Sequence, residues 1–424
     1  MAVRDLHSHR LGHTQDMRTR WNFQAIGSGT VLVAAALAAL IVLLALGYAT
    51  GWDATWRAIG VTPLKPHFFD MHAVTDQAAC SAQGYNAYEV NSCAPLKFNY
   101  PPIWLQLGYL GIDGLDSAWL SILVAFIAFV VVATLLKGRS ALNGVLSSAA
   151  ILSPSVMMGV ERGNIDLVIL ALVGSAALVL KDAKFRRAFG ASLVVLVAVF
   201  LKLYPVFCVA LVAKFNRRTL FFAITLIIGS LIYFYSIFDY LPIIRANTPI
   251  SFMLSYGYKV IFLGLDHLRA EAGREALRLA DTWLPIALVF IVLAFGLAAA
   301  AYFAFNREPL CMVINGAAGT AFLFGSGIYC GTYLLETNFI YRLMFLLLCI
   351  PQIQDWMKSN PENNNLTVTI SYVLQVFVLL TLWSNGNSNG HSTFVVTAQL
   401  LNWGLFFGFV SILALNCISS IRHT

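Results

Sequence analysis

Apolar residues in this chain gather in long runs that are separated by short polar or charged stretches. The first run spans about residues 26–49 and covers the ~20 residues with which a helix crosses a bilayer. A cleaved signal peptide has a shorter apolar core and a small-residue cleavage site, so this run predicts a retained first span. Further apolar runs lie at about 117–136, 142–158, 165–180, 188–201, 204–213, 220–237, 284–304, 310–329, 339–350, 368–383 and 394–415.

These runs predict an all-α, polytopic membrane protein with about twelve membrane segments, several of them shorter than a full crossing. We expect residues 1–24 to form a cytoplasmic N-terminal tail and residues 25–424 to form one transmembrane domain. The stretch 188–213 has basic clusters at both ends, yet it is long enough for only one crossing. Because Pro205 disfavours a continuous helix, we expect two half-crossings that meet at residues 201–205.

The composition agrees with a membrane protein and changes how the charge is interpreted. Of 424 residues, 59% are hydrophobic and 11% are charged, whereas a soluble domain is about 45–50% apolar and about 25% charged. This difference excludes most soluble enzymes, disordered proteins and nucleic-acid-binding modules. The formal net charge of +7 therefore indicates no nucleic acid partner, and its meaning lies in where the basic residues sit relative to the spans.

The basic residues predict the orientation of the chain, because cytoplasmic loops carry an excess of Lys and Arg. If the N-terminus is cytoplasmic, alternating loops place more than half of the 27 basic residues on the inner side. We therefore expect both termini on the cytoplasmic side of a plasma (inner) membrane and the active face on the periplasmic or extracellular side. The residues placed inside are Arg4, Arg10, Arg18, Arg20, Lys137, Arg139, Lys181, Lys184, Arg186, Arg187, Lys214, Arg217, Arg218, Arg307, Lys358 and Arg422.

Two long polar segments fall on the predicted outer side, at residues 51–116 and 239–283. In the first segment, the apolar and aromatic stretch 101–112 predicts an interfacial helix or a short dip into the membrane. In the second segment, charged residues interleaved with Leu and Ala at 268–279 predict an amphipathic helix on the membrane surface.

Two of the seven cysteines, Cys80 and Cys93, share the first polar segment. A disulfide between them is compatible with an oxidising outer compartment, but sequence alone leaves the geometry open. The other five cysteines lie in or beside apolar runs and are expected to be packing residues. No spacing of Cys and His indicates a zinc or haem site, so we assign no metal ligand.

Charged side chains at membrane depth are costly and therefore indicate function. Three cations, Arg162, Lys202 and Arg342, fall at the outer ends of their segments and are expected to converge on one layer. Arginine offers a planar fork to phosphate oxygens and lysine a compact charge, so this set suits a phosphate group. A carboxylate on the aqueous side of the bound group would serve as a general base. The acidic residues of the same layer are Glu161, Asp166 and Glu336.

Simpler interpretations of these charges stay open. Glu161 with Arg162, and Glu336 with Arg342, would also suit ordinary ion pairs at helix ends. Lys202 has no acidic neighbour nearby in the sequence, so a purely structural role is harder to assign to it.

Asp70 is the preferred acid of the first polar segment because aromatic and histidine neighbours indicate an ordered loop. Any single acid in such a loop is more often a solvated charge than a catalyst. His67 and His72 flank Asp70 but lack metal-site companions at a diagnostic spacing.

Several short motifs along the chain together resemble the pattern of a known superfamily. They are Phe68-Phe69-Asp70-Met71-His72, Gly84-Tyr85-Asn86-Ala87-Tyr88, Tyr100-Pro101-Pro102, Ser153-Pro154, Arg162-Gly163-Asn164, Lys202-Leu203-Tyr204-Pro205 and Tyr341-Arg342. Over about residues 25–350, the chain resembles the GT-C superfamily of glycosyltransferases that use polyprenyl-phosphate sugars. Within it, the chain is most similar to glycosyltransferase family 87, a group of polytopic, mannosyltransferase-like proteins.

The resemblance implies a GT-C-like membrane fold and inversion of the anomeric centre of a sugar carried on a lipid phosphate. By position, Asp70 would be the catalytic base, and Arg162, Lys202 and Arg342 would hold the donor phosphate. Many members carry two adjacent acids in the first loop, a pattern that is absent here, where Asp76 is a weaker second candidate. Metal use is therefore open. The other residues expected to bind substrate are Asn164, Tyr204, Tyr100, Glu161 and His72.

The expected reaction moves a hexose (mannose-like) or a pentose from a polyprenyl-phosphate donor to a lipid or glycan acceptor on the outer face. No cytoplasmic loop carries a nucleotide-binding fingerprint, so a lipid-carried donor is the more natural choice. The expected partners are this donor, the acceptor and membrane lipids, with no cofactor and no nucleic acid. In family 87 the Tyr-Pro-Pro element often opens a span; that arrangement here would add a crossing and place Lys137 and Arg139 outside.

Two other functions are compatible with the sequence. A transporter or flippase for a lipid-linked or anionic substrate would need polar residues at the midplane and paired broken helices, whereas these charges gather at one face. A polysaccharide polymerase or ligase would use Arg-rich outer loops. The second polar segment keeps that alternative open, since it carries Arg245, Arg269, Arg274 and Arg278.

Overall fold

The computed structural model describes residues 27–136, 140–180, 185–249, 251–306, 312–358, 361–384 and 392–422. Within these residues the chain is mainly helical, with one two-stranded sheet, so the all-α prediction is confirmed. The predicted tail at 1–24 lies outside the described residues, as do the predicted inner cations Lys137, Arg139, Lys181, Lys184 and Arg307.

Several helices of the described chain are long and apolar enough to cross a membrane, which makes this a polytopic membrane protein. Two further helices, α6 (Ala141–Ile151) and α7 (Pro154–Glu161), together form one more candidate span with a bend of 49°. The long helices are α1 (Ser28–Thr50), α5 (Ser117–Leu135), α10 (Arg217–Ser236), α13 (Leu284–Phe305), α16 (Pro361–Ser384) and α17 (Ser392–Arg422).

The remaining predicted segments form shorter helices, so the count of about twelve stays a prediction. The long helices expose apolar side chains to their surroundings, and among the shorter elements α9 does the same at Phe185, Phe189 and Leu193. Most of the other shorter elements are largely buried. The shorter elements are α8 (Asp166–Val179), α9 (Phe185–Leu201), α14 (Gly316–Tyr333), α15 (Ile350–Trp356) and the 3₁₀ helices η4 (Tyr204–Ala213) and η6 (Ile340–Leu348).

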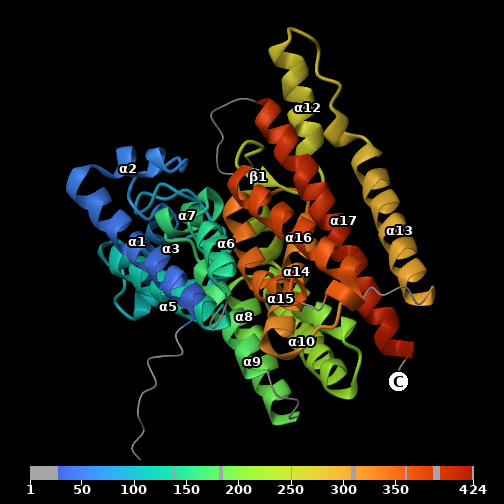
Figure 1. Cartoon of the computed structure of the whole chain (residues 1–424). Helices are drawn as coiled ribbons and strands as arrows, with labels where there is room; N and C mark the ends of the chain where they lie inside the picture. Colours follow the sequence, from blue (N-terminus) through green and yellow to red (C-terminus); the bar gives the residue numbers. More distant parts are fainter. Residues whose placement is uncertain are drawn as a thin grey trace, which may run out of the picture.

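The two polar segments contribute their own short elements. Figure 1 shows α2, β1 and α12 toward one end of the molecule and the C-terminal end of α17 toward the other. The first segment contains α2 (Trp52–Ala58), α3 (Phe69–Ala82), η2 (Pro102–Leu105), α4 (Gln106–Tyr109) and η3 (Gly114–Asp116). The second contains α11 (Tyr240–Asn247), β1 (Ser255–Tyr256), α12 (Val260–Glu271) and η5 (Leu279–Asp281), and β1 pairs with β2 (Asn338–Phe339).

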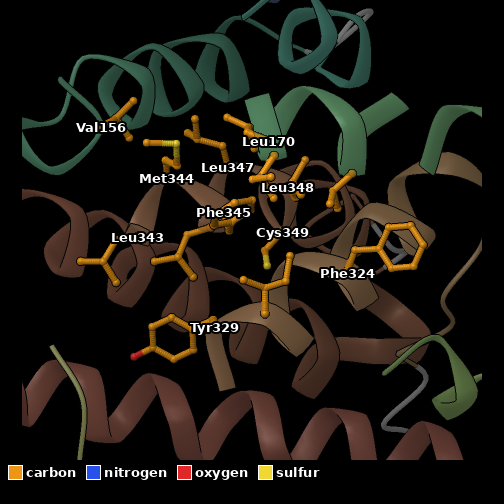
Figure 2. Close-up of a cluster of buried hydrophobic side chains, with 14 of the residues drawn as sticks. Val156, Leu170, Phe324, Tyr329, Leu343, Met344, Phe345, Leu347, Leu348 and Cys349 are labelled. Carbon is orange, nitrogen blue, oxygen red and sulfur yellow. The ribbon is translucent and has the colours of Figure 1, made fainter. Parts of the chain in front are cut away.

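The core lies around η6, whose residues are all buried except the partly exposed Arg342. Figure 2 shows its side chains between Val156 of α7, Leu170 of α8 and Phe324 of α14. Gly325 lets α14 approach closely, because an added Cβ would lie 2.7 Å from the carbonyl oxygen of Phe345. Irregular 3₁₀ backbone is thus enclosed by protein, which is where a membrane protein tolerates it.

The stretch 188–213 breaks where its sequence predicts. The helix α9 ends at Leu201, and after two residues the chain continues as η4 from Tyr204. Pro205 occupies the first turn of η4, a position at which its missing N–H costs no helical hydrogen bond. The break is confirmed, while the two half-crossings of a membrane stay a prediction.

The amphipathic helix expected at 268–279 is wrong in its position. The helix α12 ends at Glu271, and Gly273 follows with a positive φ of 70°. The carboxylate of Asp266 then accepts hydrogen bonds from the backbone N–H groups of Leu277 (3.0 Å) and Leu279 (2.7 Å). These bonds turn the chain back beside α12, so the charged residues after Glu271 lie on a loop.

The interfacial helix expected at 101–112 is formed as two consecutive turns, η2 and α4, over residues 102–109. Their depth relative to a membrane stays a prediction. Asp113 caps the next turn, η3, by accepting a 2.8 Å hydrogen bond from Leu115 N–H, and α5 starts directly afterwards.

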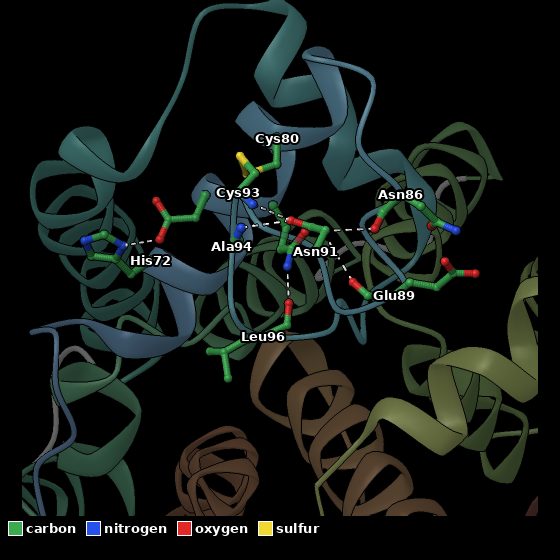
Figure 3. Close-up of a disulfide and its surroundings, with 10 residues drawn as sticks. His72, Cys80, Asn86, Glu89, Asn91, Cys93, Ala94 and Leu96 are labelled. Carbon is green, nitrogen blue, oxygen red and sulfur yellow. Dashed lines mark hydrogen bonds and ion pairs between the residues drawn. A yellow bond between two sulfur atoms is a disulfide. The ribbon is translucent and has the colours of Figure 1, made fainter.

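Cys80 and Cys93 form a disulfide, which settles the question that the sequence left open. Figure 3 shows the bond beside Asn91, whose Oδ1 accepts hydrogen bonds from the N–H groups of Cys93 (3.0 Å) and Ala94 (2.9 Å). The side-chain amide of Gln77 on α3 also donates to the carbonyl of Leu96. The disulfide and these bonds fasten residues 83–97 to α3.

Replacing Cys80 by serine should lower the free energy of unfolding by about 2–4 kcal/mol, because the disulfide closes a short loop in the unfolded chain. Limited proteolysis should also reach residues 83–97 more readily. Both effects are measurable on the detergent-purified protein, with Cys417→Ser, which removes a cysteine outside any disulfide, as the matched control. Equal stability of the two variants would contradict a structural role for the bond.

Candidate functional site

The turn at residues 162–164, between α7 and α8, sets the position of Asp70. The carbonyl of Arg162 accepts hydrogen bonds from the N–H groups of Asp70 (3.0 Å) and Met71 (3.3 Å), which are free donors in the first turn of α3. Gly163 in this turn has a positive φ of 56°, and an added Cβ would collide with the side chain of Ser121. The turn therefore needs glycine, and it docks α3 against the end of α7.

A pocket of about 540 Å³ opens beside Asp70. Its walls come from distant parts of the chain: the start of α3, the segment before η2, the end of α7, the end of α11 and the start of η6. The ladder β1–β2 joins the second polar segment to the chain just before η6. The lining residues are Leu64, Phe69, Asp70, Ala73, Leu96, Lys97, Asn99, Tyr100, Arg162, Ala246, Asn247, Pro249, Phe339 and Tyr341.

Asp70 is the carboxylate of this pocket. Its Oδ2 accepts a hydrogen bond from the side-chain amide of Asn164. Burial raises the pKa of Asp70 above its ordinary value, and the charges of Arg162 and Lys202 oppose that rise. A carboxylate with a raised pKa is a stronger proton acceptor once it is ionised, as a general base requires.

Arg162 is the guanidinium of the pocket, and its side chain is almost entirely buried. It lies over the rings of Phe339 (5.7 Å to the centroid) and Tyr341 (5.8 Å). Within the described part of the chain it forms no salt bridge, and its Nε is buried without a hydrogen-bond partner. A buried guanidinium that lacks a counter-charge and has an unused donor would be stabilised by an anion bound in the pocket.

Lys202 and Arg342 lie behind the pocket and are paired with Asp166. The Nζ of Lys202 is 2.5 Å from Asp166 Oδ1, and the Nε of Arg342 is 3.4 Å from Oδ2. The hydroxyl of Tyr204 donates a 2.8 Å hydrogen bond to Oδ1. Asp166 itself is fully buried, so its charge depends on these partners.

The three cations expected to hold a phosphate thus converge, but they differ in what they face. Arg162 lines the pocket, whereas Lys202 and Arg342 are not among its lining residues. The Nζ of Lys202 lies 5.1 Å from the centre of the Tyr100 ring, which forms part of the wall. Tyr204 lies with the Asp166 cluster rather than in the pocket, and Tyr100 is a lining residue.

Glu161 and His72 point elsewhere. Glu161 accepts hydrogen bonds from the indole N–H of Trp52 (3.2 Å) and the backbone N–H of Leu64 (3.1 Å), so it ties α2 and the pocket wall to α7. His72 contacts Asp76, with 2.8 Å between Nδ1 and Oδ2. Neither His72 nor Asp76 lines the pocket.

The ion pairs suggested by sequence neighbours are replaced by others. Within the described residues, Glu161 and Arg162 do not pair, and Arg342 pairs with Asp166 instead of Glu336. Glu336 is 3.1 Å from the Nζ of Lys259 and forms a longer contact of 3.7 Å with Arg245. The bond from Glu336 to Lys259 joins the second polar segment to the chain that leads into η6.

Four polar residues of the site were not singled out as substrate-binding from the sequence: Lys97, Asn99, Asn247 and Tyr341. Tyr341 directly precedes Arg342, so the motif that indicated Arg342 as a site residue could also have indicated Tyr341. The others lie in polar segments where nothing distinguishes them. Asn247 reaches the pocket because its amide donates 3.0 Å hydrogen bonds to the carbonyls of Tyr88 and Phe98.

No protein-family model matches this chain, and no curated protein or solved structure is significantly similar to it. Within the described residues, no group of three or more His, Cys, Asp or Glu side chains is placed to hold a metal ion.

Replacing Asp166 by asparagine should destabilise the protein by about 3–5 kcal/mol, because two buried cations lose their shared counter-charge. Detergent-denaturation titrations of the purified protein measure this loss. The control is Asp53→Asn, which breaks the solvent-exposed pair with Lys65 (3.6 Å) and should cost at most about 1 kcal/mol. Coincident unfolding curves for the two variants would show that the Asp166 cluster does not stabilise the fold.

Proposed function

We propose that this protein is an integral membrane glycosyltransferase that takes a hexose or pentose from a polyprenyl-phosphate donor. The observation that carries the proposal is that Asp70 and Arg162 line the same pocket. A carboxylate and a guanidinium without a salt-bridge partner face the same space, and the surrounding walls combine apolar and aromatic side chains with Lys97, Asn99 and Asn247. The resemblance of the motifs around both residues to the GT-C superfamily supports the same function.

The two residues divide the reaction between them. Asp70 accepts the proton of the acceptor hydroxyl as its oxygen attacks the anomeric carbon of the sugar. The bond from that carbon to the phosphate oxygen breaks, and polyprenyl phosphate leaves with the bonding electrons. Arg162 stabilises the charge that develops on the phosphate. Attack opposite the leaving group inverts the anomeric centre.

The pocket suits a substrate that is part lipid and part sugar. Its volume of about 540 Å³ falls within the ~300–1,000 Å³ of common small-molecule sites. Phe69, Phe339 and Leu96 supply apolar surface, while Asn99 and Asn247 supply polar groups for hydroxyls. The acceptor, a lipid or a glycan, binds with its hydroxyl group next to the carboxylate of Asp70.

The other functions are less well supported by the arrangement. The charged residues of the site lie at or beside helix ends: Asp70 lies in the first turn of α3, Arg162 follows α7 and Lys202 follows α9. A transport path would instead need polar groups through the midplane. Of the arginines that suggested a polymerase or ligase, none lines the pocket, and Arg245 contacts Glu336.

We place the pocket on the periplasmic or extracellular side of the plasma membrane, with both termini in the cytoplasm. The disulfide Cys80–Cys93 lies in the segment that builds the pocket, and disulfides persist in oxidising compartments. The expected excess of basic residues on the opposite side agrees with this orientation.

Asp70→Asn should reduce sugar transfer at least about 100-fold, because the amide cannot accept the acceptor proton. The assay uses purified protein in vesicles with polyprenyl-phosphate [¹⁴C]mannose, or the corresponding pentose donor, and measures release of polyprenyl phosphate and labelling of an added lipid or glycan extract. Asp281→Asn changes an exposed acid outside the pocket and should keep full activity. Transfer by Asp70→Asn at the wild-type rate would refute the assigned base.

Arg162→Met should lower kcat/KM for the polyprenyl-phosphate donor by about 10–100-fold, because a charge-assisted contact to the phosphate is lost. Arg162→Lys should retain part of the activity, since it keeps the charge but loses the planar fork. Initial rates over a series of donor concentrations measure both. The control Arg57→Met removes an exposed arginine of α2. If Arg162→Met matched that control, the phosphate would have to bind elsewhere.

A further inference from the structure

We propose that Asn164 is a positioning residue that holds one oxygen of the Asp70 carboxylate and so presents the other oxygen to the acceptor. This inference rests on the proposed function of the site. It differs from the role expected from the sequence, in which Asn164 contacts substrate. The geometry of its side-chain amide carries the inference.

Both ends of the Asn164 amide are used by the protein. The Nδ2 group donates to Asp70 Oδ2, and the Oδ1 atom accepts a 2.8 Å hydrogen bond from the backbone N–H of Asp166. The Nζ of Lys202 donates to the same Oδ1 atom over 3.4 Å. Asn164 is fully buried and is not a lining residue of the pocket, so it acts through Asp70 and not on substrate.

The two donors at Oδ1 determine which way the amide faces. A side-chain amide has one accepting and one donating end, and only its oxygen can receive the N–H of Asp166 and the ammonium of Lys202. The Nδ2 group must therefore turn toward Asp70. The sequence suggested Lys202 as a phosphate ligand. In the structure it instead helps to orient the Asn164 amide, and through that amide it orients Asp70.

The same turn of the chain holds Asp70 at its backbone and at its side chain. The carbonyl of Arg162 accepts the N–H of Asp70, and two residues later the amide of Asn164 binds the carboxylate. Within the described residues no donor binds the Oδ1 atom of Asp70. One carboxylate oxygen is thus fixed and the other is left for the acceptor hydroxyl.

The hydrogen bond from Asn164 also stabilises the ionised carboxylate, and so it lowers the pKa of Asp70 against the effect of burial. Catalysis needs ionised Asp70, so the rate falls as the pH drops through that pKa. Loss of the donor raises the pKa and moves this fall to higher pH. The other charged or titratable groups that face Asp70 are Arg162, Lys202, Asp166, Glu161, Tyr100 and Tyr341.

The test compares wild type with Asn164→Ala and with Asn164→Leu, in which the amide donor is lost, the size is nearly kept and no titratable group is added beside Asp70. In both variants the acid limb of the kcat profile should move up by about 1 pH unit or more. The KM for the polyprenyl-phosphate donor should stay within about twofold, because Asn164 does not touch substrate. A variant that was only destabilised would lose activity without a shift of the acid limb of its kcat profile at constant donor KM.

A second measurement does not depend on turnover. A hydrophobic carbodiimide modifies protonated carboxyl groups, so peptide mass spectrometry of Asp70 labelling against pH reports its protonation in the full-length protein. The labelling midpoint should rise in both variants and should stay at the wild-type value in Asn315→Ala, which changes an exposed asparagine without a side-chain cap hydrogen bond.

The two measurements separate the two proposals. A raised labelling midpoint in the variants, together with no sugar transfer by the wild type, would uphold the contact of Asn164 with Asp70 and reject the proposed function. Normal transfer by Asn164→Leu, with the labelling midpoint and the acid limb both unmoved, would reject the role of Asn164 and leave the function standing. A donor KM raised tenfold with an unmoved limb would make Asn164 a substrate contact instead.

Discussion

The compensation of buried charge is the constraint on which the rest of this structure depends. Asp166 is fully buried at the start of α8, where an unpaired carboxylate would be very costly. Its partners come from two other places in the chain: Lys202 and Tyr204 at the break between α9 and η4, and Arg342 in η6. One carboxylate therefore fixes how three irregular parts of the backbone meet.

The helix breaks follow from the same constraint. A long continuous helix would carry its charged residues away from one another, whereas breaks after Leu201 and Glu161 bring helix ends to one layer. The backbone at these breaks needs partners, and close packing of α14 against η6 and η4 encloses it. Glycines such as Gly325 make that approach feasible. Packing and electrostatics thus support the same arrangement.

The cluster also decides what each cation can do. Lys202 and Arg342 both pair with the buried Asp166 and do not line the pocket. Arg162 lines the pocket and forms no salt bridge among the described residues. The turn that carries Arg162 also grips Asp70 through a carbonyl and an amide. The base and the phosphate site of the proposed reaction therefore share one rigid support, which suits a reaction that requires accurate placement.

The sequence by itself determined the membrane class, the approximate position of nearly every apolar helix and the break near Pro205, because hydropathy and proline act locally. It also singled out Asp70, Arg162, Lys202 and Arg342, since charges are scarce in such a chain. Only the tertiary structure decided which cation pairs with Asp166, that Glu161 binds Trp52 and not Arg162, that Asn247 closes the pocket and that α12 ends at Glu271. Those outcomes depend on contacts between residues that are far apart in the chain. Local patterns of hydropathy, charge and proline do not indicate which of these residues meet in space.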